Sequence, residues 1–376
     1  AAGERLLQRT RLDELRPGGV HQEGARLHRA QVGAADDAGG GGARHQVQAD
    51  DVGAGEEIRL GHRGDAGGGA TELGIVMAGA GRFLVLEPLL GTIVLGAGLI
   101  EKAGTQDQQK LLGDIAEGKL TLAFCHYEPD SGYARGYVRA IARRDGDGYV
   151  IDGAKAHTIA AHAVDTLVIS ARLGSDKGPV ALFLVPRTSA GIKLSPAPAL
   201  DGRRGAAITL SGVRVPASAK LGDDDKDQLA TIGEGLDRGA IAVCAEAVGA
   251  MAAVTQITVD YLKERKQFGQ LLSQFQVLQH RLVDMSVTTE EARALVHAAL
   301  QAIDDGDPHA RQAVWKAKVK TAQCARFVGG QAIQLHGGMG MTDELIVGHY
   351  YKRLALCETL LGDGEWYLKQ LAAEVA

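Results

Sequence analysis

The sequence is poor in cysteine, in clustered basic residues and in long hydrophobic runs, and each shortage excludes a class of protein. Four cysteines occur in 376 residues and none forms a CxxC pair, so neither a disulfide framework nor a metal site is expected and a cytoplasmic protein fits. The net charge is −5 with no long basic run, which argues against nucleic acid as a partner. Glu87 and Pro88 interrupt the longest apolar run, residues 84–100, so membrane insertion is not expected.

Residues 1–70 also lack lysine and aromatic side chains. The first aromatic residue is Phe83 and the first lysine is Lys102. The segment is rich in Gly, Arg, Ala and His, and few of its apolar residues recur at helical spacing. It is either a mobile Gly-rich segment or an out-of-frame translation of GC-rich DNA, and the abrupt start of ordinary patterning after it favours the second. We therefore base no function on it.

Three patterns follow in the rest of the chain. Residues 71–119 read as an N-terminal helical domain, with Thr105 as a helix N-cap. Residues 120–225 hold short β-type runs separated by Gly, Pro, Asp and Ser, which predicts a middle antiparallel β domain. Residues 226–376 have apolar residues at spacings of three and four, which predicts a C-terminal four-helix bundle. The expected fold class is α+β.

Two segments of the last region could contact a nucleotide. Arg265 ends a long helix beside the turn at Gly269, where its guanidinium could reach a pyrophosphate, and Gln276 begins the next helix. Farther on, the glycines of QLHGGMG would let a backbone approach a ligand closely. Taken singly, a surface arginine and a Gly-rich helix end explain these features as well.

Together, these segments resemble the acyl-CoA dehydrogenase family, in order and in spacing, from Thr71 to the C-terminus. That family's signature for a flavin contact across the dimer interface is similar to ERKQFGQLLSQFQVLQHRLVDM, and its adenosine-and-pyrophosphate segment to QLHGGMG. In the β region, YEPDSGY stands where the family has Thr-Glu-Pro followed by Gly-Ser-Asp. The following strand pair of the family matches GDGYVIDGAKAHTIAAHAVDTLVISAR. The resemblance is close to the subunits of hetero-oligomeric members.

The resemblance implies FAD, bound non-covalently between the β domain, the C-terminal helices and a neighbouring subunit. Two of the implied contacts depart from the family pattern: Tyr127 replaces a Thr near the flavin ring, and His157 replaces a ring-stacking Trp or Phe. The other implied contacts are Arg265, Phe268 and Gln276, given to the partner's flavin, and Gln334, Gly337 and Gly338 at the other end of the flavin.

The implied reaction removes the α-proton of an acyl-CoA with a carboxylate while a hydride leaves the β-carbon for the flavin. Both positions where the family usually carries this base lack a carboxylate, because Leu361 and Gly239 occupy them. Glu358 lies three residues before Leu361, about 4.5 Å along a helix axis. It is the candidate catalytic base, with a surface ion pair as the equally weighted alternative.

Three functions remain open from the sequence. The chain is a working FAD-dependent acyl-CoA dehydrogenase with a displaced base, or a non-catalytic partner subunit that completes a flavin site on a related chain, or an unstable chain without FAD. The first is preferred. Its implied partners are an acyl-CoA substrate, an electron-transfer flavoprotein, and either further copies of itself in a homodimer or homotetramer or a related subunit in a hetero-oligomer.

Overall fold

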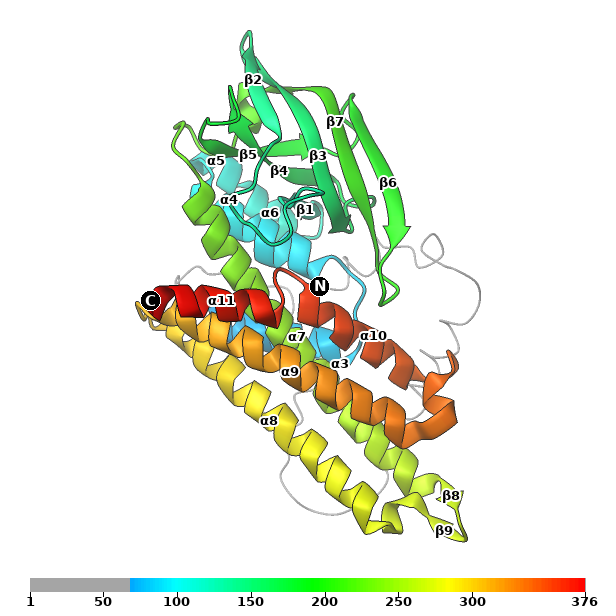
Figure 1. Cartoon of the computed structure of the whole chain (residues 1–376). Coiled ribbons are helices and arrows are strands. Elements are labelled where there is room, and N and C mark those ends of the chain that lie inside the picture. Colours follow the sequence, from blue (N-terminus) through cyan, green and yellow to red (C-terminus); the bar gives the residue numbers. More distant parts are fainter. Residues whose placement is uncertain (1–67, 376) are drawn as a thin grey trace.

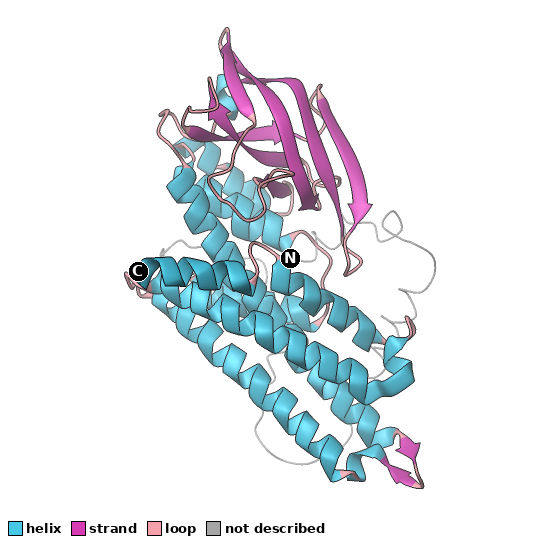
Figure 2. Cartoon of the chain, in the orientation of Figure 1, coloured by secondary structure: helices cyan, strands magenta, loops and turns pink. Residues whose placement is uncertain are grey.

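The protein is described by a computed structural model that covers residues 68–375. The sheet lies at one end of an elongated molecule, and long helices form the other end (Figure 1). Apart from one short hairpin, the strands are confined to that end (Figure 2). The α+β class and the helical–β–helical order predicted from the sequence are confirmed. The predicted anomalous segment lies outside the described residues, except for residues 68–70.

The first helical part packs against the long helix α7 (Leu229–Glu264). Gly81 and Gly249 allow this close approach, because a Cβ at Gly249 would overlap the carbonyl oxygen of Ala78. Thr105 caps its helix as predicted: its Oγ1 accepts a hydrogen bond from the backbone N–H of Gln108 (3.2 Å). The elements of this part are α3 (Ala70–Arg82), the π-helix η1 (Leu90–Ala97), α4 (Gly98–Ala103), α5 (Gln106–Gln109) and α6 (Leu111–Ala116).

The sheet is mixed, which corrects the expectation of a purely antiparallel one. Its strands run in the order β1-β4-β2-β3-β7-β6, and β5 pairs with β4. Both β1 and β2 pair in parallel with β4. Alternating polarity marks a strand but not the direction of its partner, and the long loop over residues 126–140 allows this arrangement. The strands are β1 (Leu122–Cys125), β2 (Ile141–Asp145), β3 (Gly148–Ile159), β4 (Thr166–Leu173), β5 (Val180–Pro186), β6 (Ile192–Pro198) and β7 (Arg204–Pro216).

The C-terminal helices form the predicted bundle around α7. With α8 (Gln276–Asp304), α9 (Ala310–His336) and α10 (Ile346–Thr359), α7 makes four packed helices, and α11 (Gly364–Val375) lies against α9. Between α7 and α8 the chain forms a small hairpin, which the sequence indicated only as a break. The short elements are η2 (Ala217–Ala219), β8 (Lys266–Gln267), β9 (Gln270–Leu271), η3 (Leu272–Gln274) and η4 (Gly337–Met341).

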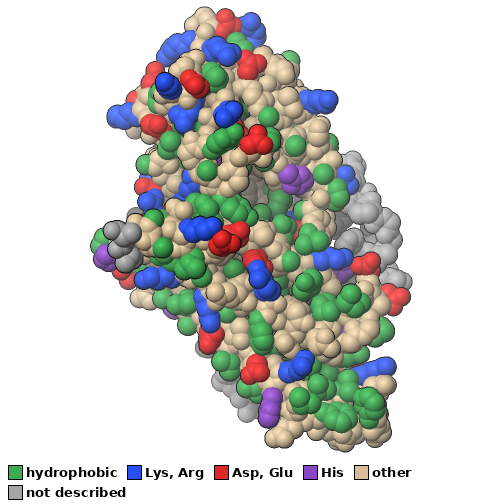
Figure 3. Space-filling model, in the orientation of Figure 1, with side chains coloured by type: hydrophobic (Ala, Val, Ile, Leu, Met, Phe, Trp, Pro, Cys, Tyr) green, Lys and Arg blue, Asp and Glu red, His purple; other side chains and the backbone are tan. Residues whose placement is uncertain are grey.

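Within the described residues, α7 is the one helix long and apolar enough to be compared with a membrane span. However, 78% of its apolar window is buried inside the protein, which is the state of a core helix. Hydrophobic side chains also gather at the waist where the sheet meets the C-terminal helices (Figure 3).

Candidate cofactor site and base positions

A buried ion pair fixes the loop that follows β1. Lys155 on β3 is 1% exposed, and its Nζ donates to Glu128 Oε1 (2.8 Å) and to the carbonyl oxygen of His126 (3.2 Å). The Glu128 carboxylate also accepts from the backbone N–H groups of Arg139 (2.8 Å) and Ala140 (3.0 Å). The loop is therefore tied at its start and at its end to a single carboxylate.

His126 lies in the same network as a neutral side chain. One ring nitrogen, Nδ1, is 3.0 Å from Ser170 Oγ, and Nε2 is 3.0 Å from the carbonyl oxygen of Arg135. Burial, reinforced by the Lys155 ammonium, lowers the pKa of His126 to about 3. The network is thus a fixed support for the loop that carries Tyr127.

The two cofactor residues predicted in the β region are next to this network in the sequence: Tyr127 follows His126, and His157 lies two residues after Lys155 on β3. Burial raises the pKa of Tyr127 to about 12, and the Arg135 guanidinium nearby opposes this shift. The buried Tyr127 hydroxyl makes no hydrogen bond of normal geometry to the described residues. His157, near the end of β3, is exposed and lies against β7: a Cβ at Gly205 would come within 2.5 Å of its Nε2. Partial burial lowers the pKa of His157.

A second charged group joins the same loop to the bundle, and sequence reasoning missed it. The Oδ1 atom of Asp237 on α7 accepts from Arg135 Nη2 (2.7 Å) and Trp315 Nε1 (2.9 Å), and its Oδ2 accepts from Arg311 Nε (3.0 Å). Arg135 also lies over the Trp366 ring, 4.9 Å from its centroid. The three partners of Asp237 lie 74 to 102 positions away from it in the sequence, so no local sequence signal could have revealed this group.

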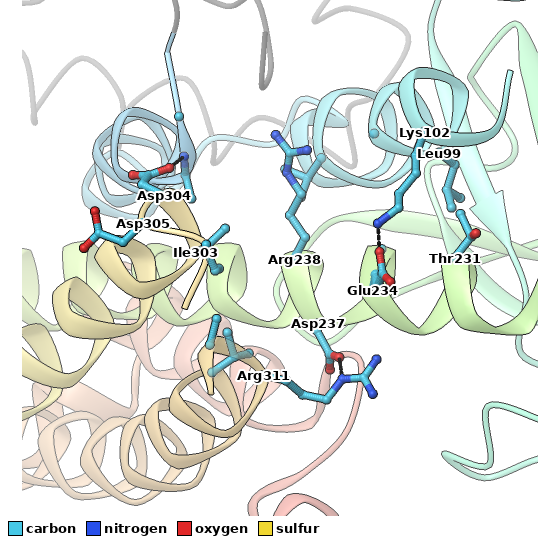
Figure 4. Close-up of a pocket in the computed structure, with 18 of the residues that line it drawn as sticks. Leu99, Lys102, Thr231, Glu234, Asp237, Arg238, Ile303, Asp304, Asp305 and Arg311 are labelled. Carbon is cyan, nitrogen blue, oxygen red and sulfur yellow. Dashed lines mark hydrogen bonds and ion pairs between the residues drawn. The ribbon is translucent and has the colours of Figure 1, made fainter. Parts of the chain in front are cut away.

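Asp237 also lines a cavity of about 760 Å³ between α3, α4, α7 and the α8–α9 connection. Asp237 and Arg311 face each other across one side of it, and Lys102 pairs with Glu234 on another (Figure 4). None of the predicted cofactor residues lines this cavity, so it is separate from the predicted flavin site.

The other predicted cofactor residues lie at the far end of the bundle. Arg265 is exposed just after α7, and Phe268 is 90% exposed with a positive φ of 55°. Stacking of Tyr261 on His336, with 4.3 Å between ring centroids, joins the ends of α7 and α9. The remaining residues of this group are all exposed: Gln276, Gln334, Gly337 and Gly338.

One chain therefore does not bring all the predicted contacts together. The hairpin β8–β9, with Phe268 in its turn, lies at the opposite end of the molecule from the sheet that carries Tyr127 and His157 (Figure 1). The same end carries the turn at Gly337, where a Cβ would meet no atom of the described chain within 4 Å. A single chain therefore cannot place both groups of predicted contacts around one cofactor.

Gly239 and Leu361, the two positions where the resemblance predicts a base, meet at one apolar point. A Cβ on Gly239 would lie 2.6 Å from Leu361 Cδ1 and 2.7 Å from Leu95 Cδ2. Leu361 has a φ of 62°, in the left-handed region, so the chain turns sharply after α10. Leucine side chains thus fill the space that a carboxylate at either position would enter.

Glu358, the candidate base, is held in an ion pair with Arg326 of α9, which includes a contact of 3.3 Å between Arg326 Nε and Glu358 Oε2. Its side chain is 16% exposed, whereas that of Arg326 is 76% exposed. Burial, Asp363 and Glu358 together raise the pKa of Tyr133, which belongs to the loop described above. Glu358 therefore lies near the loop, on the side of α10 that faces α9.

Comparison with known proteins agrees with this architecture. The family model for the C-terminal domain of acyl-CoA dehydrogenases matches residues 229–376. The probable acyl-CoA dehydrogenase YngJ of Bacillus subtilis is 33% identical over 74% of this chain and 74% of its own length. The caffeyl-CoA reductase–Etf complex subunit CarC of Acetobacterium woodii is 30% identical over 69% of each chain. A solved structure of the steroid ACAD Tcur3481–Tcur3483 has a TM-score of 0.72 and 27% identity, covering 82% of this chain and 81% of that one.

The chain therefore belongs to the acyl-CoA dehydrogenase family, as the sequence predicted. Membership makes it an oxidoreductase of the acyl-CoA dehydrogenase type, and a flavin is the cofactor that the family implies. The individual cofactor contacts and the base remain predictions.

Proposed function

We propose that this chain is a subunit of an FAD-dependent acyl-CoA dehydrogenase and that two subunits share each FAD. The observation that carries the proposal is the separation of the predicted contacts into two groups at opposite ends of one chain. Each end would supply half of a site, and a neighbouring subunit would supply the other half.

The residues present fit such a cofactor. The buried Tyr127 hydroxyl provides a hydrogen-bonding group beside the predicted flavin ring. At the other end, the open backbone at Gly337 and Gly338 allows close approach of a phosphate-bearing group, and the exposed Arg265 provides a forked donor for it. Bound FAD would supply the acceptor for the hydride that leaves the β-carbon of the acyl group.

On this chain, Glu358 is the group proposed to receive the α-proton. Its carboxylate would have to exchange Arg326 for the substrate. Because Arg326 is largely exposed, that ion pair contributes only about 0–1 kcal/mol and opposes the exchange weakly. A proton on a carboxylate oxygen of Glu358 would then complete the α,β-dehydrogenation of the thioester.

A second candidate function is favoured by the leucines at the base positions. Leu361 and Leu95 close the space beside Gly239. A subunit that only completes the flavin site of a related chain needs no carboxylate at this point, so its function would be compatible with these leucines. One structural relative is named as a pair of components, Tcur3481–Tcur3483, which supports this alternative. The CarC relative, named as part of an Etf complex, supports an electron-transfer flavoprotein as the acceptor, and a cytoplasmic location fits both candidates.

The test is to load the purified chain with FAD and follow the 450 nm flavin absorbance after adding straight-chain acyl-CoA thioesters of several lengths. Bleaching by the lone chain supports the first function. Bleaching only after a related subunit is added supports the second, and failure to retain flavin in either case refutes both. Glu358→Gln tests the base, with Glu365→Gln, which removes an exposed carboxylate paired with Lys369, as its control. Unchanged bleaching in Glu358→Gln removes Glu358 from the site.

A further inference from the structure

Four charged side chains are buried together where the sheet meets the bundle. Arg353 on α10 is 1% exposed, and its Nε lies 2.6 Å from Asp201 Oδ2 while its Nη1 lies 2.7 Å from Glu246 Oε1. Arg203 Nε is also 2.6 Å from Asp201 Oδ2, and its Nη1 is 3.6 Å from Glu246 Oε1. Two positive and two negative charges balance there, and all four side chains are buried.

These residues come from three separate parts of the fold. Asp201 and Arg203 form the turn between β6 and β7, Glu246 lies in the middle of α7, and Arg353 lies on α10. Arg353 Nη1 also donates to the carbonyl oxygen of Val85, in the connection between α3 and η1 (3.1 Å). The cluster therefore fastens one corner of the sheet to the bundle at a single point.

The turn between β6 and β7 is joined by backbone pairing to the end of β3, which carries His157. The carbonyl oxygen of Arg204, next to Arg203, accepts from the backbone N–H of Ala160 (2.8 Å), and Gly205 pairs with Ile159. The Nε2 atom of His157 lies against the same Gly205. A displacement of the β6–β7 turn would therefore move the end of β3 and the imidazole that it carries.

We propose that Arg353, Glu246, Asp201 and Arg203 form a clasp between sheet and bundle, and that this clasp positions the end of β3 for cofactor binding. These four are positioning residues, because they act through β3 and not on the cofactor itself. The part of the proposal that concerns FAD rests on the proposed function, whereas the mechanical coupling does not.

The first measurement is hydrogen exchange of the full chain without added cofactor. Arg353→Met leaves both buried carboxylates short of a partner, and we expect exchange about tenfold faster or more in segments 155–163 and 199–206. Lys352→Met removes the neighbouring exposed lysine, which pairs with Asp343 at the surface, and should change neither segment. Leu300→Ala truncates a buried side chain of α8, so it should lower stability as well but leave both segments unchanged.

The second measurement is the dissociation constant for FAD, by quenching of flavin fluorescence well below the unfolding temperature. Arg353→Met should raise it about tenfold, and Leu300→Ala should not raise it. The double variant Arg353→Met with Glu246→Gln removes one charge of each sign and should restore part of the exchange protection. If Arg353→Met does not fold, Arg353→Lys, which cannot reach both carboxylates, takes its place in both assays.

The clasp would be overturned if Arg353→Met exchanged no faster than the wild type in segments 155–163 and 199–206. It would also be overturned if Arg353→Met and Leu300→Ala both exchanged faster to the same degree over the whole chain. Local exchange at β3 with an unchanged FAD constant would overturn its role in cofactor positioning. A wild-type chain that binds no FAD either alone or together with a related subunit refutes the proposed function, and the exchange data still decide whether the clasp exists.

Discussion

Replacing Lys155 with methionine should be among the most damaging single changes in the β region. Methionine fills a similar volume, so the packing around β3 is kept and the ammonium is what disappears. The Glu128 carboxylate, 5% exposed, would keep only its two backbone N–H donors. Breaking a buried pair in this way costs about 3–5 kcal/mol, because an uncompensated charge is left behind.

A double-mutant cycle tests whether that cost comes from the buried charge that is left without a partner. Glu128→Gln alone strands the ammonium and should cost a similar amount. The double variant Lys155→Met with Glu128→Gln leaves no buried charge, so it should cost less than the sum of the two single changes by about 2 kcal/mol or more. A glutamine can still accept from the N–H of Arg139 or Ala140, which retains part of the support of the loop.

Urea unfolding at pH 7, followed by circular dichroism, measures these free energies. Lys193→Met is the control, because Lys193 is exposed on β6 and its loss should change stability by less than about 0.5 kcal/mol. A cost below about 1 kcal/mol for Lys155→Met, or strict additivity in the cycle, would show that the pair does not stabilise the loop as argued.

Three further outcomes are expected. The pKa of His126 is about 3 in the folded chain and about 6.5 when unfolded, so the unfolded chain binds more protons between these values and stability rises with pH through that window. Lowering the pH from 7 to 5 should therefore cost about 2 kcal/mol through His126. Unfolding curves of His126→Asn should show a smaller slope but not a flat one, because burial also lowers the pKa of His157, His162 and His336. Gly249→Ala, whose Cβ would overlap the carbonyl oxygen of Ala78, should cost about 1–3 kcal/mol in thermal unfolding. Phe268→Ser, at a side chain 90% exposed, should leave thermal unfolding unchanged but weaken FAD binding about tenfold in a fluorescence titration.

The helices could be predicted from the sequence because their signal is local. Apolar residues at spacings of three and four indicate long helices within residues 226–376, where α7, α8 and α9 lie, and Thr105 is recognisable as a cap from its own neighbourhood. The pairing of the sheet was not predictable in the same way. β4 joins β1 and β2 in parallel, and that choice depends on how distant segments pack and not on the polarity of any one strand.

The candidate site also has residues that the sequence could predict and residues that it could not. Arg265, Phe268 and Gly337 could be named because they lie in short segments whose residue types are informative together. The charged groups that hold the site could not be named, since Asp237 meets Arg135 and Glu246 meets Arg353 across more than a hundred positions. Only the fold shows that these side chains are partners and not surface charges.

The two buried acids of α7 bear on which proposed function is the better one. Asp237 stands two residues before Gly239 and Glu246 seven residues after it, and each meets an arginine of the β region, Arg135 or Arg203. α7 therefore uses its buried carboxylates to fix the sheet on both sides of the point where a base would stand. An unpaired buried charge costs several kcal/mol, so these pairs hold the chain in one arrangement on both sides of that point. The base point between them is apolar, which is the combination expected of a subunit that holds a cofactor in place for a neighbour. If Glu358→Gln leaves flavin reduction unchanged in a mixed complex, this second function is the one to keep.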